Sequence, residues 1–161
     1  MSITLIESKQ IKQLAELAYD VWHEYFPCIL SVDQIDYMVD KFQSERAIES
    51  QINDGYEYYF IENCAEKCGY FCIKNEKKRL FLSKFYIKKE ARGKKLASEA
   101  FKYITEYCRQ NGINNIYLHV NKYNINSIEI YKHLGFEIDG SDIGDIGNGY
   151  VMDDYIMSKN I

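Results

Sequence analysis

The order of hydrophobic and polar residues in the N-terminal part of the chain predicts a strand followed by a helix. A short apolar run at residues 3–6 predicts the strand. Apolar residues then recur at helical spacing until about Trp22, and the segment around Pro27 ends this helix because proline lacks the backbone N–H that a helix needs. The apolar face of the helix consists of Ile11, Leu14, Ala18 and Val21.

A second helix is predicted to begin at Ser31. Ser31 and Gln34 form a capping-box pattern, in which the two side chains satisfy free N–H groups at a helix start. A further short helical turn is expected at residues 45–53, ending before Gly55. The apolar face of the second helix consists of Ile35, Met38 and Phe42.

The central part of the chain predicts three strands and a long helix. Residues 56–62, 67–74 and 79–87 are rich in aromatic and β-branched residues and are separated by short polar connections. Helical spacing returns after the third strand, and Gly112 stands where a left-handed glycine commonly ends a helix. The apolar stripe of this helix consists of Leu96, Ala100, Ile104 and Cys108.

The C-terminal part predicts a strand at residues 114–120, a helix that Gly135 ends, and two last strands within residues 136–140 and 149–157 that a glycine-rich segment joins. The resulting order is β-α-α-β-β-β-α-β-α-β-β. We therefore expect an α/β (α+β) fold, with a mixed, mostly antiparallel central sheet and helices on both faces. Residues 1–161 are expected to form a single domain.

Composition and charge narrow the class of protein. No apolar run approaches the roughly 18–20 residues that span a bilayer, and the N-terminus lacks the pattern of a signal peptide, so we expect a cytoplasmic protein without a membrane partner. The net charge of −4 argues against a nucleic-acid partner. Abundant Asn, Lys, Ile and Tyr with a single proline would fit an AT-rich bacterial genome.

The five cysteines invite a metal interpretation that their spacing does not support. Cys64, Cys68 and Cys72 follow one another at four-residue intervals, but no second pair or histidine cluster follows downstream. We expect ordinary thiols, with Cys68 and Cys72 on one face of a strand, and no metal site or disulfide framework.

A cluster of basic residues separates the strand at 79–87 from the helix that follows it. Helix N-termini usually favour acidic residues because of the helix dipole, and Lys94 and Lys95 go against this preference. Free backbone N–H groups at a helix start, a tight turn at Gly93 and the charge of Arg92 together predict an anion site large enough for a pyrophosphate. The alternative is a solvated basic turn.

Two motifs resemble the GNAT superfamily of acyl-CoA N-acyltransferases. The pattern [RQ]-x-x-G-x-[GA] is matched at Arg92, Leu96 and Ala97, but Lys95 occupies the usual glycine. We expect Lys95 to adopt a helical conformation that keeps its N–H donor available. The pattern N-x-x-[AS]-x-x-x-Y-x-x-x-G-F is matched by Asn124, Ser127, Tyr131, Gly135 and Phe136. The order of elements also matches the family, so the resemblance covers essentially the whole chain.

The resemblance implies how acetyl-CoA would bind. The turn would bind the pyrophosphate, the preceding strand would pair with the pantetheine arm, and this strand would splay from the next one to open a slot for the thioester. Tyr131 would protonate the departing thiolate; the alternative is a core tyrosine. The implied cofactor-binding residues are Phe85, Tyr86, Ile87, Arg92, Gly93, Lys94, Lys95, Leu96, Ala97, Asn124, Ser127 and Tyr131.

The group that deprotonates the acceptor amine stays open at this point. Many family members carry a glutamate on the strand before the turn, and the strand at 79–87 has no carboxylate. The remaining candidates are His119, His23 and Glu24, each with an ordinary structural role as the alternative, or a chain of ordered water.

The acceptor is expected to bind between the first helix and the last two strands, at Trp22, Tyr25, Phe26, Tyr150 and Asp153. Aspartates of the last strands could attract a cationic amine such as a polyamine or a lysine side chain, or they are solvent-facing turn residues: Asp142, Asp145, Asp153 and Asp154.

The resemblance thus implies an N-acetyltransferase that moves an acetyl group from acetyl-CoA to a primary amine by direct attack. The expected acceptor is a small cationic amine, and the protein is expected to be a monomer or homodimer without a metal. The alternatives are an acetyltransferase that acts on a protein N-terminus or lysine, and a catalytically silent acyl-CoA-binding regulatory module.

Overall fold

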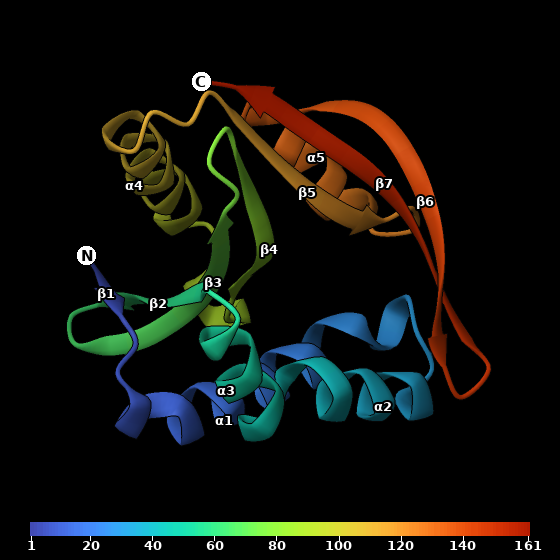
Figure 1. Cartoon of the computed structure of the whole chain (residues 1–161). Helices are drawn as coiled ribbons and strands as arrows, with labels where there is room; N and C mark the ends of the chain where they lie inside the picture. Colours follow the sequence, from blue (N-terminus) through green and yellow to red (C-terminus); the bar gives the residue numbers. More distant parts are fainter.

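A computed structural model describes residues 1–161 and shows a seven-stranded sheet with helices on both faces (Figure 1). The strand order is β1-β2-β3-β4-β5-β7-β6, and β4–β5 is the one parallel pair among antiparallel neighbours. This is the mixed, mostly antiparallel α/β fold that the sequence predicts. The strands are β1 (Ser2–Leu5), β2 (Tyr56–Asn63), β3 (Glu66–Asn75), β4 (Arg79–Ile87), β5 (Asn115–Asn121), β6 (Glu137–Gly147) and β7 (Tyr150–Asn160).

The helices form two groups on opposite sides of the sheet. The largest apolar cluster joins α4 and α5 to one face of β3, β4 and β5. On the other face, α1 and α3 pack against the sheet through residues such as Leu14, Ile48 and Tyr70. Figure 1 shows α1, α2 and α3 together below the sheet and α4 above it. No helix combines the length and apolar character needed to cross a membrane. The helices are α1 (Ile11–Tyr25), α2 (Val32–Gln43), α3 (Glu45–Asn53), α4 (Leu96–Gln110) and α5 (Ile125–His133).

Most predicted elements are found, with three differences in extent. The first helix runs on to Tyr25, and the break around Pro27 is a single 3₁₀ turn. The expected helical turn at 45–53 is a regular helix, because Ser44 accepts a hydrogen bond from the N–H of Ala47 and caps it. The glycine-rich segment after residue 140 belongs to β6, since small residues also fit an extended backbone that a long neighbouring strand pairs.

Cys68 and Cys72 do not share a face of β3, which corrects the prediction from their spacing. The pairing of β2 with β3 shifts between Ile61 and Glu62, so that Cys68 is one extra residue on β3. Such a bulge reverses the alternation of side chains. Cys68 therefore packs on the α4 side and Cys72 on the α1 side, and all five cysteines are free.

A second irregularity and a parting of strands shape the middle of the sheet. The register of β3 with β4 shifts at Cys72 so that Ser83 is an extra residue on β4. On its other side, β4 pairs with β5 only from Arg79 to Phe81. Beyond Phe81 the two strands separate, as the resemblance implies. The β5-facing backbone edge of β4 from Leu82 onward is therefore left without a strand partner.

Candidate functional site

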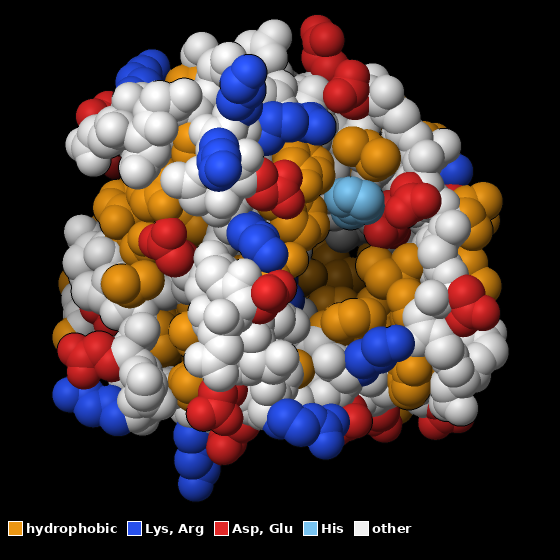
Figure 2. Space-filling model, in the orientation of Figure 1, with side chains coloured by type: hydrophobic (Ala, Val, Ile, Leu, Met, Phe, Trp, Pro, Cys, Tyr) orange, Lys and Arg blue, Asp and Glu red, His pale blue; other side chains and the backbone are white.

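A cavity of about 540 Å³ opens where β4 and β5 part. Its walls come from β4, from the end of β5 and the start of α5, from β6 and β7, and from α1 and α2 below. Figure 2 shows this hollow, with hydrophobic side chains inside and charged side chains around its rim. The predicted site residues that line it are Trp22, Phe26, Phe85, Tyr86, His119, Asn124, Ser127 and Tyr131.

The other predicted acceptor-binding residues do not line the cavity. Tyr150 packs against Tyr37, with ring centroids 5.3 Å apart. Asp153 forms an ion pair of 2.7 Å with Lys122, on the opposite face of β7 from Asp154, because successive residues of a strand point to opposite faces. Tyr25 lies beside the cavity and connects two of its walls.

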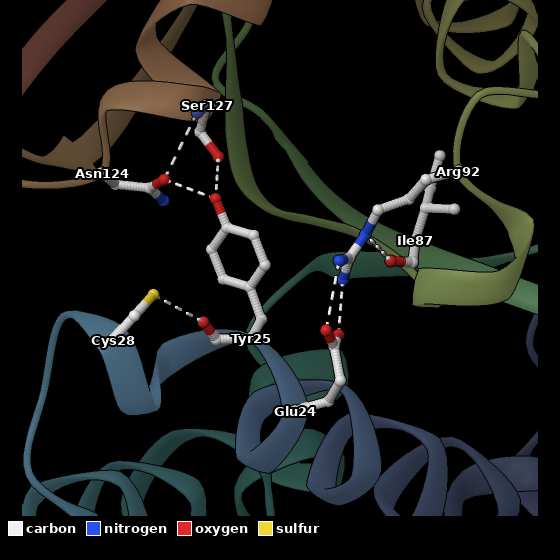
Figure 3. A network of polar contacts seen from close by, with 7 residues as sticks. All are labelled: Glu24, Tyr25, Cys28, Ile87, Arg92, Asn124 and Ser127. Atoms are coloured by element: carbon white, nitrogen blue, oxygen red, sulfur yellow. Dashed lines mark hydrogen bonds and ion pairs between the residues drawn. The ribbon is translucent and has the colours of Figure 1, made fainter.

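Glu24, a candidate base, is held by the basic turn. Its carboxylate accepts two hydrogen bonds from the guanidinium of Arg92, at 2.7 and 3.3 Å. The Nε of Arg92 also donates to the backbone oxygen of Ile87 at 2.9 Å, at the end of β4 (Figure 3). The fork geometry fixes both side chains. Glu24 therefore orients the turn and has no free position at the cavity wall.

Tyr25 joins the first helix to α5. Its hydroxyl donates to Oδ1 of Asn124 at 2.5 Å and lies 3.2 Å from Oγ of Ser127. Asn124 also caps α5, because its side chain accepts from the N–H of Ser127 at 3.3 Å. Figure 3 shows Tyr25 reaching from α1 to α5 while Glu24 reaches to the basic turn. The end of α1 thus holds together the elements on either side of the parted strands.

His23, another candidate base, is committed to a contact between α1 and α2. Its Nε2 lies 2.5 Å from the carboxylate of Asp36, and its Nδ1 lies 2.8 Å from the backbone oxygen of Tyr19. Burial lowers the pKa of His23, but these hydrogen bonds and the charges of Asp36 and Asp20 outweigh burial and raise it overall. His23 does not line the cavity. His119 does, and it is the only histidine that faces it.

The basic turn has two left-handed residues directly before α4. Gly93 has φ of 77°, and Lys95, the N-cap residue of α4, has φ of 62° and ψ of 9°. The expected helical conformation of Lys95 is therefore wrong. A left-handed backbone is strained for residues with a Cβ, which explains physically why glycine suits this position. The first N–H groups of α4 still lack intrahelical partners and point out of its start, toward the turn.

Two tyrosines line the cavity where β4 and β5 separate, Tyr86 on β4 and Tyr131 on α5. Burial raises the pKa of Tyr131, with the nearby Tyr25 hydroxyl adding to the shift, so its hydroxyl keeps its proton at neutral pH. Burial also raises the pKa of Tyr86. Tyr131, Asp154 and Tyr25, in order of decreasing effect, raise it further through their charge. These groups therefore lie within electrostatic range of one another. Neither the Tyr131 nor the Tyr86 hydroxyl forms a hydrogen bond within the protein, which leaves both free for a ligand.

Lys84 is a buried cation that the sequence interpretation missed. It lies on β4 directly after the bulge, lines the cavity, and is only 7% exposed. Its ammonium donates to the backbone oxygen of Phe42 at 2.6 Å, to Oε1 of Gln51 at 2.7 Å and to the Tyr58 hydroxyl. Burial lowers its pKa to about 8. A lone lysine within an apolar strand is the sequence signal that could have drawn attention to it.

Asp154 is a buried carboxylate at the opposite wall. It is 4% exposed, lines the cavity, and its Oδ1 has no hydrogen-bond partner. The pKa of Asp154 is raised overall, chiefly by burial. Asp142 and Asp153 also raise this pKa, whereas His119 and Lys122 lower it. Asp142 faces Asp154 directly across the β6–β7 pair. Neither here nor elsewhere do three His, Cys, Asp or Glu side chains lie together in an arrangement that could bind a metal ion.

The chain was compared with protein families, with curated sequences and with solved structures. A family model described as the acetyltransferase (GNAT) family matches residues 15–136. No curated protein sequence matches the chain. Many solved structures share its fold, and at their low identities the likeness concerns the fold alone.

Three of these structures illustrate the likeness. The PaiA N-acetyltransferase from Thermoplasma acidophilum, solved in complex with coenzyme A, has a TM-score of 0.77 and 20% identity, with 100% of both chains covered. A GCN5-related N-acetyltransferase from Rhodopseudomonas palustris has a TM-score of 0.84 and 11% identity, over 99% of this chain and 95% of that one. An aminoglycoside 6′-acetyltransferase of type Ii has a TM-score of 0.71 and 17% identity, over 99% and 97%.

Proposed function

Because this chain belongs to the acetyltransferase (GNAT) family, we propose that it transfers an acetyl group from acetyl-CoA to the primary amine of a small, cationic molecule. The observation that carries the proposal is the separation of β4 from β5 beyond Phe81. The cavity that opens there is lined by Tyr131 and Tyr86. The separation leaves one backbone edge free beside a cavity that contains an unpaired proton donor.

The residues present fit acetyl-CoA as the donor. The free edge of β4 from Leu82 to Ile87 suits an extended arm with amide groups, which would pair like an added strand. The turn from Arg92 to Lys95 and the start of α4 offer positive charge and free N–H groups, which suit a pyrophosphate. Asn124 and Ser127, on the far side of the slot, would contact the same arm.

The reaction would be a direct attack of the amine nitrogen on the thioester carbonyl. A new C–N bond forms, the C–S bond breaks, and the thiolate takes a proton from Tyr131, which is protonated at neutral pH. The attacking nitrogen loses a second proton as it becomes an amide, and this proton restores the Tyr131 hydroxyl, directly or through water. An alkylammonium must first lose a proton, which costs roughly 4–5 kcal/mol at neutral pH. Among the predicted bases, His119 alone lines the cavity, so His119 or water at the rim is proposed to accept this proton.

The shape of the acceptor side favours a small molecule over a protein. The cavity is recessed between α2 and the β6–β7 pair and walled by aromatic and aliphatic side chains. A peptide segment would require an open groove along the surface. A small amine requires only an enclosed pocket with a few polar groups.

Thermal unfolding with different ligands tests the donor. Acetyl-CoA and CoA at ~100 times their Kd should each stabilise the protein by ~2.7 kcal/mol, a shift of several degrees, while ATP and NAD leave Tm unchanged. Mass spectrometry of a reaction with an amine mixture then tests transfer. No shift with acetyl-CoA would contradict the donor, and a shift without any acetylated amine would favour a silent binding module.

A further inference from the structure

The acceptor side of the cavity is mostly hydrocarbon. The side chains there come from the end of α1, from the face of α2 and from the inner faces of β6 and β7. Most belong to one apolar cluster or pack against it. Such apolar side chains favour an apolar ligand surface, because burying it removes hydrocarbon from water. The apolar part of the wall consists of Phe26, Leu30, Met38, Phe42, Ile146 and Met152, and the uncharged amides of Gln34, Gln43 and Gln51 line the same side.

Asp154 is the buried one of the two carboxylates, Asp142 and Asp154, that line this pocket. Its Oδ1 is buried and has no hydrogen-bond partner, although a buried carboxylate oxygen without a partner is costly. The titratable groups around it are Asp142, Asp153, His119 and Lys122, and Lys122 is already paired with Asp153. An ammonium ion in the cavity beside this carboxylate would offset the cost of burying its charge. Asp154 is also in electrostatic range of Tyr86, near the head of the slot.

Lys84 is the one lysine or arginine that lines the cavity, and it lies on the side of α2 and α3. It lies near the end of α2, bound to the backbone oxygen of Phe42, and its hydrogen-bond partners include no carboxylate. Its charge is therefore not neutralised by the protein. A second positive charge on the ligand would meet either the hydrocarbon wall or the repulsion of Lys84. The only carboxylates that line the cavity are Asp142 and Asp154, side by side on neighbouring strands.

From this arrangement we propose that the acceptor is an amine with a single positive charge on an apolar body, rather than a polyamine. The ammonium group binds Asp154, and the hydrocarbon part lies between α2 and the β6–β7 pair. This inference rests on the proposed function and specifies the substrate class of the same site. It replaces the polyamine that the aspartates alone suggest.

Hexylamine and cadaverine provide a matched pair for the test. The two molecules have the same number of non-hydrogen atoms and differ in a terminal methyl group against a second ammonium. Initial rates of acetyl transfer, with products identified by mass spectrometry, should give a kcat/KM at least roughly tenfold higher for hexylamine. A value for cadaverine that equals or exceeds that of hexylamine overturns the inference.

Variants then locate the ammonium site. Asp154→Asn removes the charge at nearly constant shape and should lower kcat/KM for hexylamine by roughly tenfold or more, with acetyl-CoA affinity unchanged. Asp139→Asn, on an exposed position of β6, is the matched control and should leave both unchanged. Unchanged acceptor kinetics in folded Asp154→Asn overturn the assignment of Asp154.

Calorimetric binding of the two amines to the CoA-saturated protein separates this inference from the proposed function. Preference for hexylamine over cadaverine, lost in Asp154→Asn, supports the inference even if no acetyl transfer occurs. Absence of transfer to any amine overturns the proposed function, and preferred binding of cadaverine overturns the inference alone.

Discussion

At the scale of single residues, the site depends on groups that the protein itself leaves unsatisfied. The hydroxyl of Tyr131 and Oδ1 of Asp154 have no partner within the protein, whereas Glu24 and His23 are each tied into an ion pair. Unpaired polar groups in a cavity cost free energy unless a ligand satisfies them. The unsatisfied groups are therefore the better candidates for contacts with substrate.

Tyr131→Phe tests the proton donor. The change removes one hydroxyl and keeps the ring that packs against Phe101 and Phe136, so folding should be preserved. We expect kcat to fall roughly 100-fold or more while acetyl-CoA affinity stays within experimental error. Tyr103→Phe, on α4, is the control for loss of a tyrosine hydroxyl. Equal losses of kcat and affinity in Tyr131→Phe would contradict the general-acid assignment.

Lys95→Gly tests the strain before α4. A left-handed conformation costs a residue with a Cβ ~1 kcal/mol, partly offset by the greater freedom of glycine in the unfolded chain. We expect a net gain of about 0.5 kcal/mol in the free energy of unfolding, measured in urea, and cofactor binding that is intact or tighter. Lys77→Gly is a matched control, since Lys77 has φ of 74° in the β3–β4 turn. A tenfold weaker acetyl-CoA affinity would instead show that the Lys95 ammonium contacts phosphate.

At the scale of elements, β4 is shaped by its neighbours on both sides. The bulge at Ser83 rotates the strand so that Lys84 and Tyr86 face α1 and α2, while Phe85 packs toward α4. Loss of pairing with β5 frees its other edge. Near its end, β4 lies very close to β3, where Gly69 opposes Ile87. The position of the free edge therefore depends on packing against β3.

Gly69→Ala tests that close approach. A Cβ at Gly69 would lie 2.3 Å from the backbone oxygen of Tyr86, so β4 would have to move. We expect a loss of roughly 1–3 kcal/mol in stability, together with weaker acetyl-CoA binding. Gly140→Ala on β6 is the control, because a Cβ there meets nothing within 4 Å. If the Gly69→Ala protein is as stable as the control variant, the two strands can move apart at this point at little cost in free energy.

At the scale of the whole molecule, α1 links the two halves of the structure on either side of the slot. Its last turn holds the basic turn through Glu24 and the start of α5 through Tyr25. Lys84 fastens the end of α2 and α3 to β4 in the same region. The buried charge of Lys84 also makes the stability of the whole protein depend on pH.

Lys84 should contribute a rise in the free energy of unfolding between about pH 8 and 9. Lys84 has a folded pKa of about 8 and an unfolded value near 10.5, so in this range the unfolded chain binds more protons and stability rises with pH. The gain is at most about 1 kcal/mol over one pH unit. Above about pH 9 the trend reverses, because burial raises the pKa of Cys72 to about 12 and of Cys108 to about 11.

Urea denaturation under reducing conditions at several pH values measures this curve. Lys84→Met should remove the contribution of Lys84 and keep the fall caused by the thiols, which then begins between about pH 8 and 9. A pH dependence between about pH 8 and 9 that is the same in Lys84→Met and in the unchanged protein would show that Lys84 keeps a pKa close to its ordinary value.

The sequence by itself determined the order of the elements, the basic turn before α4, and the spacing of Asn124, Ser127 and Tyr131 on α5. These features depend on residues close together in the chain, whose periodicity and turn chemistry are local. The fold class and the family followed from them, and both are confirmed.

Only the tertiary structure decided which side chains face the cavity. Bulges at Cys68 and Ser83 shift strand faces, and both depend on pairing with a neighbouring strand. The ion pair of Glu24 with Arg92 joins residues that lie far apart in the sequence. Asp154, rather than its neighbour Asp153, faces the cavity because β7 pairs in one particular register with β5 and β6. Register and long-range partners are properties of the assembled sheet, and a local pattern does not contain them.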